Sequence, residues 1–231
     1  MVGATRKARV VGRSALSPRV TELTLAIEGD EPFRWLAGQH VRLRPDLPSG
    51  AASAFSIAAA PSQTGLRRLS LALSNGGALL AQMEVGSLVG LEGPFGAFTW
   101  QPAPGALLVG AGTGLAPLRA IVHDALGSDE ATPVVLVAGN RSELDLLWHV
   151  ELATLASEHP RFRYEPVVSQ PDATWRGRRG HVQEHLEQIT SSLPSGFGAY
   201  LCGSHRMVNA CRELLGKLGL TPERIRYEAD A

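Results

Sequence analysis

The strongest constraint on the fold is a glycine-rich segment that directly follows an apolar run. Leu107-Leu108-Val109 leads into Gly110-Ala111-Gly112-Thr113-Gly114, and Leu115-Ala116-Pro117 comes next. The apolar run predicts a buried strand, and proline in the first turn of a helix costs no hydrogen bond. The segment therefore predicts a strand, a tight turn and a helix. Glycines let a ligand approach the backbone, and a helix N-terminus offers free N–H groups to phosphate. Taken alone, the spacing also fits a tight turn that binds no ligand, because Leu115 occupies the last glycine position of the G-x-G-x-x-G pattern.

Beyond this segment, apolar runs alternate with helical patterns. The runs cover residues 134–138, 164–168, 199–202 and 225–227. Apolar residues at helical spacing predict one amphipathic helix from Leu144 to Leu155 and another from Met207 to Leu218. Strands that alternate with helices predict a parallel sheet in an α/β domain. A second glycine turn follows Tyr200-Leu201-Cys202, which predicts Cys202 at the same edge of the sheet as the first glycine turn.

The first hundred residues follow a different pattern, in which short strands are separated by turn residues. Val20–Ile27 and Arg68–Ser74 alternate apolar and polar side chains, which is typical of half-buried antiparallel strands. Further strand candidates lie at residues 10–11, 41–43, 55–58 and 87–92. About six strands at this spacing predict a small antiparallel β-barrel. The pattern changes at Gln101–Gly105, so we predict a barrel domain over residues 1–102 and an α/β domain over residues 103–231.

Composition excludes several classes of function. Lys+Arg and Asp+Glu both total 22, so there is no basic excess for a dedicated nucleic-acid binder. No apolar run reaches the length of a membrane span, and no secretory signal is apparent. The two cysteines, Cys202 and Cys211, have neither disulfide nor metal-ligand spacing, which favours a reducing cytoplasm and no metal or iron–sulfur site.

Six segments, spread in order over nearly the whole chain, resemble motifs of the ferredoxin–NADP reductase superfamily, and most closely those of the short bacterial NAD(P)H:flavin oxidoreductases. The segments are Gly38-Gln39-His40-Val41, Ser53-Ala54-Phe55-Ser56, Gly93-Pro94-Phe95-Gly96, Gly110 to Pro117, Val167 to Val182, and Tyr200 to Gly203 with Met207. The resemblance implies a flavin-binding Greek-key barrel followed by a nucleotide-binding α/β domain.

The resemblance also implies roles for individual residues. Ser56 is expected to offer its hydroxyl to flavin N5, and Cys202 to pack near the nicotinamide. Phe55 and Ile57 are expected to line the flavin ring. The other expected cofactor contacts are Pro94, Gly110, Gly112, Thr113, Gly114, Pro117, Arg141, Ser169, Gln170, Gly203 and Met207. From its position alone, Ser56 also fits a serine that fills a strand, whereas Cys211 falls on the apolar face of a helix and predicts a core residue.

The implied activity is that of an NAD(P)H:flavin oxidoreductase, in which a hydride passes from NADH or NADPH to the N5 atom of FMN, FAD or riboflavin. The cofactors carry this chemistry and the protein orients them, so no catalytic triad is needed.

Two departures from the family pattern concern the flavin phosphate. Ser53 stands where the family has an arginine, and Ala78 follows Gly76-Gly77 where the family has a serine or threonine. Both changes remove phosphate contacts. Three interpretations remain open: a weakly held flavin that exchanges as a substrate, which we favour; a bound-flavin reductase subunit that passes electrons to a monooxygenase or an iron–sulfur partner; and a flavin-free relative that kept the fold for nucleotide binding or protein interaction.

The residues that follow the apolar run 164–168 bear on the choice between NADH and NADPH. NADPH-preferring relatives often carry an arginine after the serine that corresponds to Ser169, and this chain has Gln170 there. Arg141 is a candidate substitute for that arginine. We expect NADH to be used at least as well as NADPH.

Overall fold

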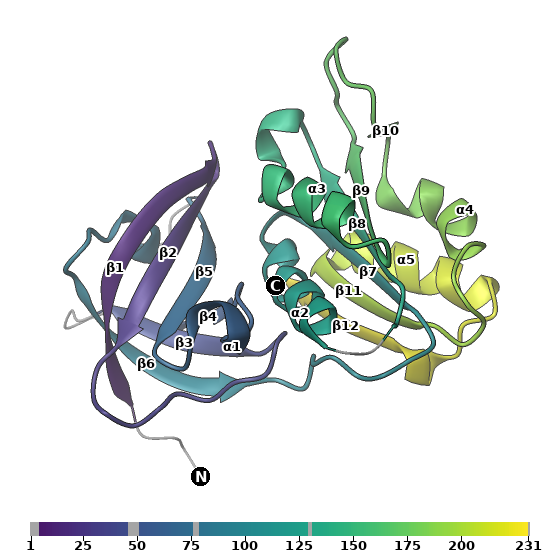
Figure 1. Cartoon of the computed structure of the whole chain (residues 1–231). Coiled ribbons are helices and arrows are strands. Elements are labelled where there is room, and N and C mark those ends of the chain that lie inside the picture. Colours follow the sequence, from purple (N-terminus) through teal and green to yellow (C-terminus); the bar gives the residue numbers. More distant parts are fainter. Residues whose placement is uncertain (1–4, 46–50, 76–78, 129–130, 231) are drawn as a thin grey trace.

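The protein consists of two sheets joined by a single connection (Figure 1). The computed structural model describes residues 5–45, 51–75, 79–128 and 131–230. Each sheet has six strands, the first antiparallel and the second parallel. The predicted fold class is therefore confirmed. The predicted boundary between residues 102 and 103 lies between Phe95, where the first sheet ends, and Ala106, where the second begins. That boundary stays a prediction.

The N-terminal sheet has the order β4-β3-β6-β1-β2-β5. Its edge strands β4 and β5 approach each other just beyond the end of β4, through a bridge between Ile57 and Leu71 and a hydrogen bond from Ala58 N to Ser70 O at 2.7 Å. The elements are β1 (Arg6–Ser17), β2 (Val20–Ile27), β3 (His40–Pro45), β4 (Ser53–Ser56), α1 (Pro61–Thr64), β5 (Arg68–Ser74), the 3₁₀ turn η1 (Leu79–Gln82) and β6 (Leu88–Phe95).

The inner face of this curved sheet is a core of aliphatic side chains. Leu23, Leu25, Leu69 and Leu71 come from alternate positions of β2 and β5 and are at most 1% exposed. The period-two prediction holds for β2, but β5 is buried on both faces. The reason is that the α/β domain covers the outer face of β5. Ala72, on that face, belongs to a core cluster shared by the two domains.

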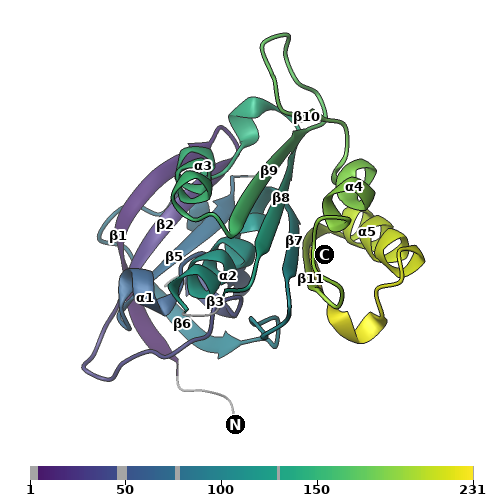
Figure 2. The ribbon, with the colours of Figure 1, turned by 45° about the vertical axis from the view of Figure 1, so that its right-hand side comes forward.

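The C-terminal sheet has the order β10-β9-β8-β7-β11-β12, with all neighbours parallel. Alternate residues of β7 face opposite sides: Leu108 packs in the cluster that includes α2, and Leu107 in the cluster that includes α5. Figure 2 shows α2 and α3 on one side of the sheet and α4 and α5 on the other. The strands are β7 (Ala106–Ala111), β8 (Val134–Asn140), β9 (Phe162–Val168), β10 (Arg178–Arg179), β11 (Gly198–Ser204) and β12 (Ile225–Asp230). The helical elements are η2 (Gly112–Gly114), α2 (Leu115–Gly127), η3 (Glu143–Asp145), α3 (His149–Glu158), η4 (Val182–His185), α4 (Leu186–Thr190), α5 (His205–Lys217) and η5 (Pro222–Arg224).

The helix predicted from Leu144 to Leu155 is wrong at its N-terminal end. Helix α3 begins only at His149, and Leu144 lies in η3 with 73% of its surface exposed. Between them, Trp148 takes a left-handed backbone conformation with φ 51°. A right-handed helix cannot pass through a residue in this conformation. The second predicted helix is confirmed as α5, where Cys211 is fully buried.

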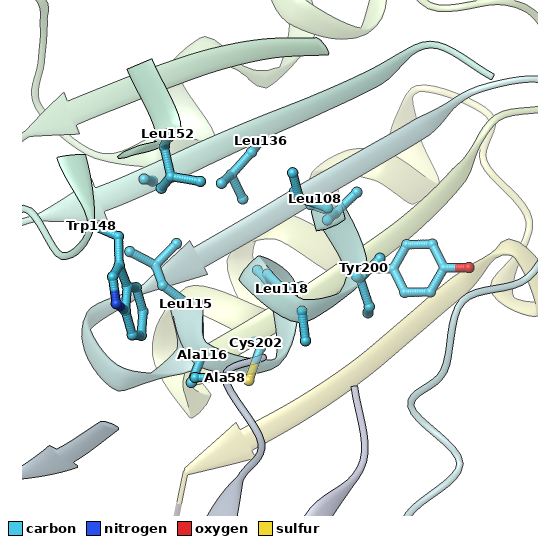
Figure 3. Close-up of a cluster of buried hydrophobic side chains, with 14 of the residues drawn as sticks. Ala58, Leu108, Leu115, Ala116, Leu118, Leu136, Trp148, Leu152, Tyr200 and Cys202 are labelled. Atoms are coloured by element: carbon cyan, nitrogen blue, oxygen red, sulfur yellow. The ribbon is translucent and has the colours of Figure 1, made fainter. Parts of the chain in front are cut away.

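The two domains share a buried core. Figure 3 shows Ala58, from the segment after β4, close to Ala116 of α2 and Cys202 of β11, and all three belong to one cluster of buried side chains. Small side chains at these positions allow the backbones of the two domains to approach closely. The end of β4, where Ser56 lies, is therefore packed against the α/β domain.

Polar contacts around Arg119 of α2 reinforce this junction. Its Nη1 donates to the carbonyl of Ala58 at 2.7 Å, and its Nε donates to Glu151 of α3 at 2.8 Å. The guanidinium also lies over the ring of Trp148 at 5.1 Å. Trp148 Nε1 in turn donates to Glu22 of the barrel at 3.4 Å. One arginine and one tryptophan thus connect both domains.

Candidate functional site

A cleft of about 610 Å³ lies at the carboxyl ends of β7, β8, β9 and β11. This is the position at which open parallel sheets bind ligands, because strand order reverses between β7 and β11. The α/β domain forms most of the wall, and the barrel adds the β1–β2 turn and the end of β5. The lining residues are Ser17, Arg19, Val20, Ser74, Ala111, Gly112, Thr113, Gly139, Asn140, Arg141, Asp145, Leu147, Ser169, Gln170, Gly180, His181, Val182, Gln183, Ser204, Arg206, Met207 and Ala210.

The glycine-rich turn lines the cleft through Gly112 and Thr113, and the predicted order of strand, tight turn and helix is confirmed as β7, η2 and α2. Gly112 has φ 56°, a conformation that glycine adopts without the cost that a side chain brings. An ideal Cβ on Gly114 would lie 2.6 Å from the carbonyl carbon of Cys202 and 2.8 Å from the amide nitrogen of Gly203. Only a residue without a side chain lets η2 pack this closely on β11. The turn then runs directly into α2, and the N–H groups of η2 lie at the N-terminal end of this helix, a position that suits an anion.

A second turn, between β11 and α5, forms the neighbouring wall. The Ser204 hydroxyl caps α5 by accepting a hydrogen bond from Met207 N at 3.4 Å. Gly203 has φ 147° and lies under the Met207 side chain, whose Cε would be 2.8 Å from a Cβ at that position. Cys202, Gly203 and Met207, which were predicted as site residues, therefore lie together at the end of β11, next to η2.

The lining is rich in cationic side chains. Arg19, Arg141 and Arg206 come from three separate elements, whereas Asp145 is the single carboxylate among the lining residues that the structure describes. Arg141 Nε donates to Gln170 Oε1 at 2.9 Å, which holds the guanidinium at the end of β8 and β9. An excess of positive charge in a cleft favours an anionic ligand.

The predicted nucleotide contacts fall into two groups. Gly112, Thr113, Arg141, Ser169, Gln170 and Met207 line the cleft. Gly110, Gly114, Pro117, Cys202 and Gly203 are buried behind it and shape the turns that carry the first group. These placements bring together residues from four strand ends, although their contact with a cofactor stays a prediction.

The predicted flavin contacts of the barrel lie outside this cleft. Ser56 is half-buried at the end of β4 and pairs with His40 of β3, and Pro94 is half-buried in β6. Phe55 packs against the barrel core, and Ile57 is 0% exposed within it. The Ile57 side chain is directed into the barrel core, and the contact of Phe55 and Ile57 with a flavin ring stays a prediction. The second predicted phosphate position, Ala78 after Gly76-Gly77, lies outside the described residues.

Two titratable residues that were not predicted as site residues, His40 and Glu228, lie on either side of Gly96. Glu228 of β12 pairs in register with Cys202, and an ideal Cβ on Gly96 would lie 3.0 Å from His40 Nδ1 and 3.5 Å from Glu228 Oε1. Burial and the nearby charge of Arg42 lower the pKa of His40. His40 lies within the Gly38-Gln39-His40-Val41 motif, whereas no sequence signal places Glu228 beside the barrel.

Neither a group of candidate metal ligands nor a helix long and apolar enough to span a membrane occurs in the described part of the chain. Across residues 5–45, 51–75, 79–128 and 131–230, no three His, Cys, Asp or Glu side chains are grouped to hold a metal ion. Over the same ranges, no helix has the length and apolar character needed to cross a bilayer.

Comparison with known proteins identifies the family. Residues 108–213 match the model of the oxidoreductase NAD-binding domain. The chain is 36% identical over 234 residues to ferredoxin–NADP reductase B of Sorangium cellulosum (strain So ce56), an alignment that covers 96% of each chain. The chain belongs to the ferredoxin–NADP reductase family. The predicted resemblance is therefore confirmed, and the α/β half of this reductase-family chain is an oxidoreductase NAD-binding domain.

Other relatives of this family member are longer proteins. It is 30% identical over 233 residues to the ferredoxin–NAD(P)+ reductase component of a naphthalene 1,2-dioxygenase system from Pseudomonas putida, and covers 97% of its own length but 70% of that relative. The structure of Amycolatopsis cytochrome P450 reductase GcoB superposes with a TM-score of 0.87 at 29% identity, covering 98% of this chain and 69% of that one.

Proposed function

We propose that this protein is an NAD(P)H-dependent flavin reductase that delivers the electrons of a nicotinamide coenzyme to a flavin and from there to an acceptor. The observation that carries the proposal is the cationic cleft at the switch point of the parallel sheet, with its glycine-rich turn packed on Cys202. Membership of the ferredoxin–NADP reductase family supports the same reaction class. When bound, a flavin accepts a hydride at N5 and releases electrons singly or in pairs.

The described residues fit a dinucleotide. The N–H groups of η2 suit the pyrophosphate, because Gly112 leaves open space and nothing lies within 4 Å of its ideal Cβ position. Arg141, Ser169 and Gln170 suit the adenosine half at the far end of the cleft. Cys202 belongs to the core cluster shared with Ala58 of the barrel, where the nicotinamide would have to approach a flavin, and Met207 lines the cleft beside it.

The fit to a flavin depends on the end of β4. Ser56 is the half-buried hydroxyl at the domain junction, and we propose that it donates a hydrogen bond to flavin N5. Close packing of Ala58 against Ala116 and Cys202 keeps this strand end fixed relative to the dinucleotide cleft, so the protein can hold both rings in one orientation without moving a domain.

We further propose that the protein binds its flavin weakly. Ser53 is exposed on β4 and offers no guanidinium to a phosphate. Flavin would then be held mainly by its ring and would exchange as a substrate. The alternative is a reductase with resident FAD or FMN that serves an oxygenase or an iron–sulfur partner, and the name of the Pseudomonas relative favours it.

One experiment tests the function and separates these forms. The purified chain is examined by visible spectroscopy, and NADH oxidation is followed with and without riboflavin, FMN or FAD. A colourless protein that turns over only with added flavin supports exchange. A yellow protein that reduces an artificial acceptor without added flavin supports resident cofactor. Absence of both colour and turnover would refute the proposed function and leave a flavin-free relative.

Ser53→Arg tests the proposed phosphate loss. We expect it to tighten binding of FMN and FAD more than binding of riboflavin, since riboflavin has no phosphate. Ala54→Arg is a matched control, because adjacent residues of a strand point to opposite faces. Equal effects of Ser53→Arg on all three flavins would contradict the hypothesis.

Coenzyme preference is tested by kinetics. Because Gln170 occupies the position after Ser169, we expect kcat/KM for NADH to equal or exceed that for NADPH. A large preference for NADPH would contradict this expectation and make Arg141 the first residue to test as a contact for the 2′-phosphate.

A further inference from the structure

The barrel contributes an arginine to the wall of the dinucleotide cleft. Arg19 lies in the turn between β1 and β2, where its N–H donates to Ser17 Oγ at 3.2 Å and its carbonyl accepts from Asn75 N at 2.8 Å. The next residue, Val20, pairs with Ser74 at the end of β5. These contacts fix the backbone on both sides of Arg19, so its side chain projects into the cleft from a defined position.

The present partner of Arg19 is a weak one. Its Nε lies 3.9 Å from Asp145 Oδ1 across the cleft, and the Arg19 side chain is 63% exposed. Asp145 is held in place separately, because the Ser142 hydroxyl donates to its Oδ2 at 2.8 Å. A long and solvated ion pair contributes little to stability, so Arg19 can exchange Asp145 for another anion at small cost.

The position of Arg19 selects one part of an anionic ligand. Strand β5 packs against η2, so the turn that carries Arg19 faces the glycine-rich turn of Gly112 and Thr113 across the cleft. Arg141, in contrast, is tied to Gln170 at the ends of β8 and β9. Arg19 is therefore placed for the pyrophosphate and Arg141 for the adenosine end.

We propose that Arg19 binds the pyrophosphate of the dinucleotide from the barrel side, opposite the N–H groups of η2. This inference rests on the proposed function, because it assumes that the cleft takes a nicotinamide dinucleotide. It adds a binding residue from the other domain, so that dinucleotide affinity depends on how the barrel and the α/β domain are held together. Guanidinium geometry suits two phosphate oxygens at once.

The test is calorimetric titration of the full chain with ADP-ribose, which carries the pyrophosphate and adenosine but no nicotinamide. Arg19→Gln is expected to weaken binding roughly tenfold, as loss of a charge-assisted contact does. Asp145→Asn is expected to leave affinity unchanged or to tighten it, because it removes the carboxylate that competes for Arg19. Arg68→Gln is the matched control, since Arg68 is an exposed arginine of β5 that does not line the cleft.

The two variants of the ion pair distinguish phosphate binding from a structural role. Opposite or unequal effects, with only Arg19→Gln weakening ADP-ribose binding, support the proposal. Equal weakening by Arg19→Gln and Asp145→Asn would mean that the pair merely fastens the domains, and an Arg19→Gln affinity within twofold of wild type would also overturn the proposal. If the wild-type chain itself binds no ADP-ribose, the proposed function fails, and the inference about Arg19 fails with it.

Discussion

Replacing Gly114 by alanine is the sharpest test of how η2 is built. The added Cβ would lie 2.6 Å from the carbonyl carbon of Cys202 and 2.8 Å from the nitrogen of Gly203, whereas unstrained carbon contacts are about 3.5–4.0 Å. Both neighbours are backbone atoms, so no rotamer change relieves the overlap, and η2 or β11 must shift by roughly 1 Å. Overpacking of this kind costs about 1–3 kcal/mol, and the backbone contacts place Gly114→Ala near the upper value.

Gly112→Ala is the matched control for this prediction. Gly112 has φ 56° but nothing within 4 Å of its ideal Cβ, so alanine there meets conformational cost without a clash. That cost is about 1–2 kcal/mol. Urea unfolding of the wild type and both variants at pH 7 measures the free energies. A loss near 3 kcal/mol also corresponds to a fall in Tm of roughly 6–12 °C for a chain of this size.

The ranking of the two variants decides the outcome. A shift of β11 also moves Cys202 and Gly203. Gly114→Ala should therefore weaken the affinity of the folded protein for ADP-ribose, in addition to lowering its free energy of unfolding. If Gly114→Ala proves no more destabilising than Gly112→Ala, the close approach of η2 to β11 is not what requires glycine, and the reasoning is refuted.

Two further predictions concern titratable groups, one half-buried and one fully buried. Burial acts to raise the pKa of Glu151, but hydrogen bonds from His123 and Arg119, together with their charges, outweigh it and hold the pKa below its usual value. Glu151 therefore stabilises the fold above the pKa of the unfolded chain, and this contribution disappears as pH falls through the lower folded-state pKa. Glu151→Gln should remove that part of the pH dependence and lower the free energy of unfolding at pH 7 by about 1–3 kcal/mol, measured by urea unfolding between pH 3 and 7; an unchanged pH profile would contradict this. Burial raises the pKa of the Cys211 thiol to about 12, so iodoacetamide at pH 8 should modify Cys211 only after unfolding. Mass spectrometry of the labelled chain checks it, and rapid labelling in the folded state would be the contrary result.

Local patterns predicted the elements that positions near in sequence determine. The predicted strands Val20–Ile27 and Arg68–Ser74 have the bounds of β2 and β5, because their period-two apolar side chains all meet the barrel core, although the outer face of β5 is buried as well. The glycine-rich turn between β7 and α2 was predictable for a related reason. A tight βα turn needs small residues at particular positions, and Gly112 and Gly114 supply them within a few residues of each other.

Contacts between the domains were beyond such patterns. Arg19 belongs to the barrel, yet it lines a cleft whose glycine-rich turn follows about ninety residues later in the chain, and Glu228 reaches Gly96 from the last strand. Nothing in the periodicity of a segment states which distant segment its outer face will meet. The predicted site therefore contains only residues that lie within a family motif or a turn. The residues that reach the site from a distant segment, such as Arg19 and Glu228, were missed.

The helix predicted from Leu144 shows the same limit acting on secondary structure. Apolar residues at positions 144, 147, 148, 152 and 155 fit a single helical face, but Trp148 leaves that face with φ 51° and inserts between the domains. There it lies under the Arg119 guanidinium at 5.1 Å and is only 9% exposed. The burial of a large aromatic side chain between the domains outweighs the small preference of one turn for helix. The helix therefore does not extend past Trp148, and Leu144 stays exposed. Where local pattern and structure disagree here, the residue responsible joins the two domains.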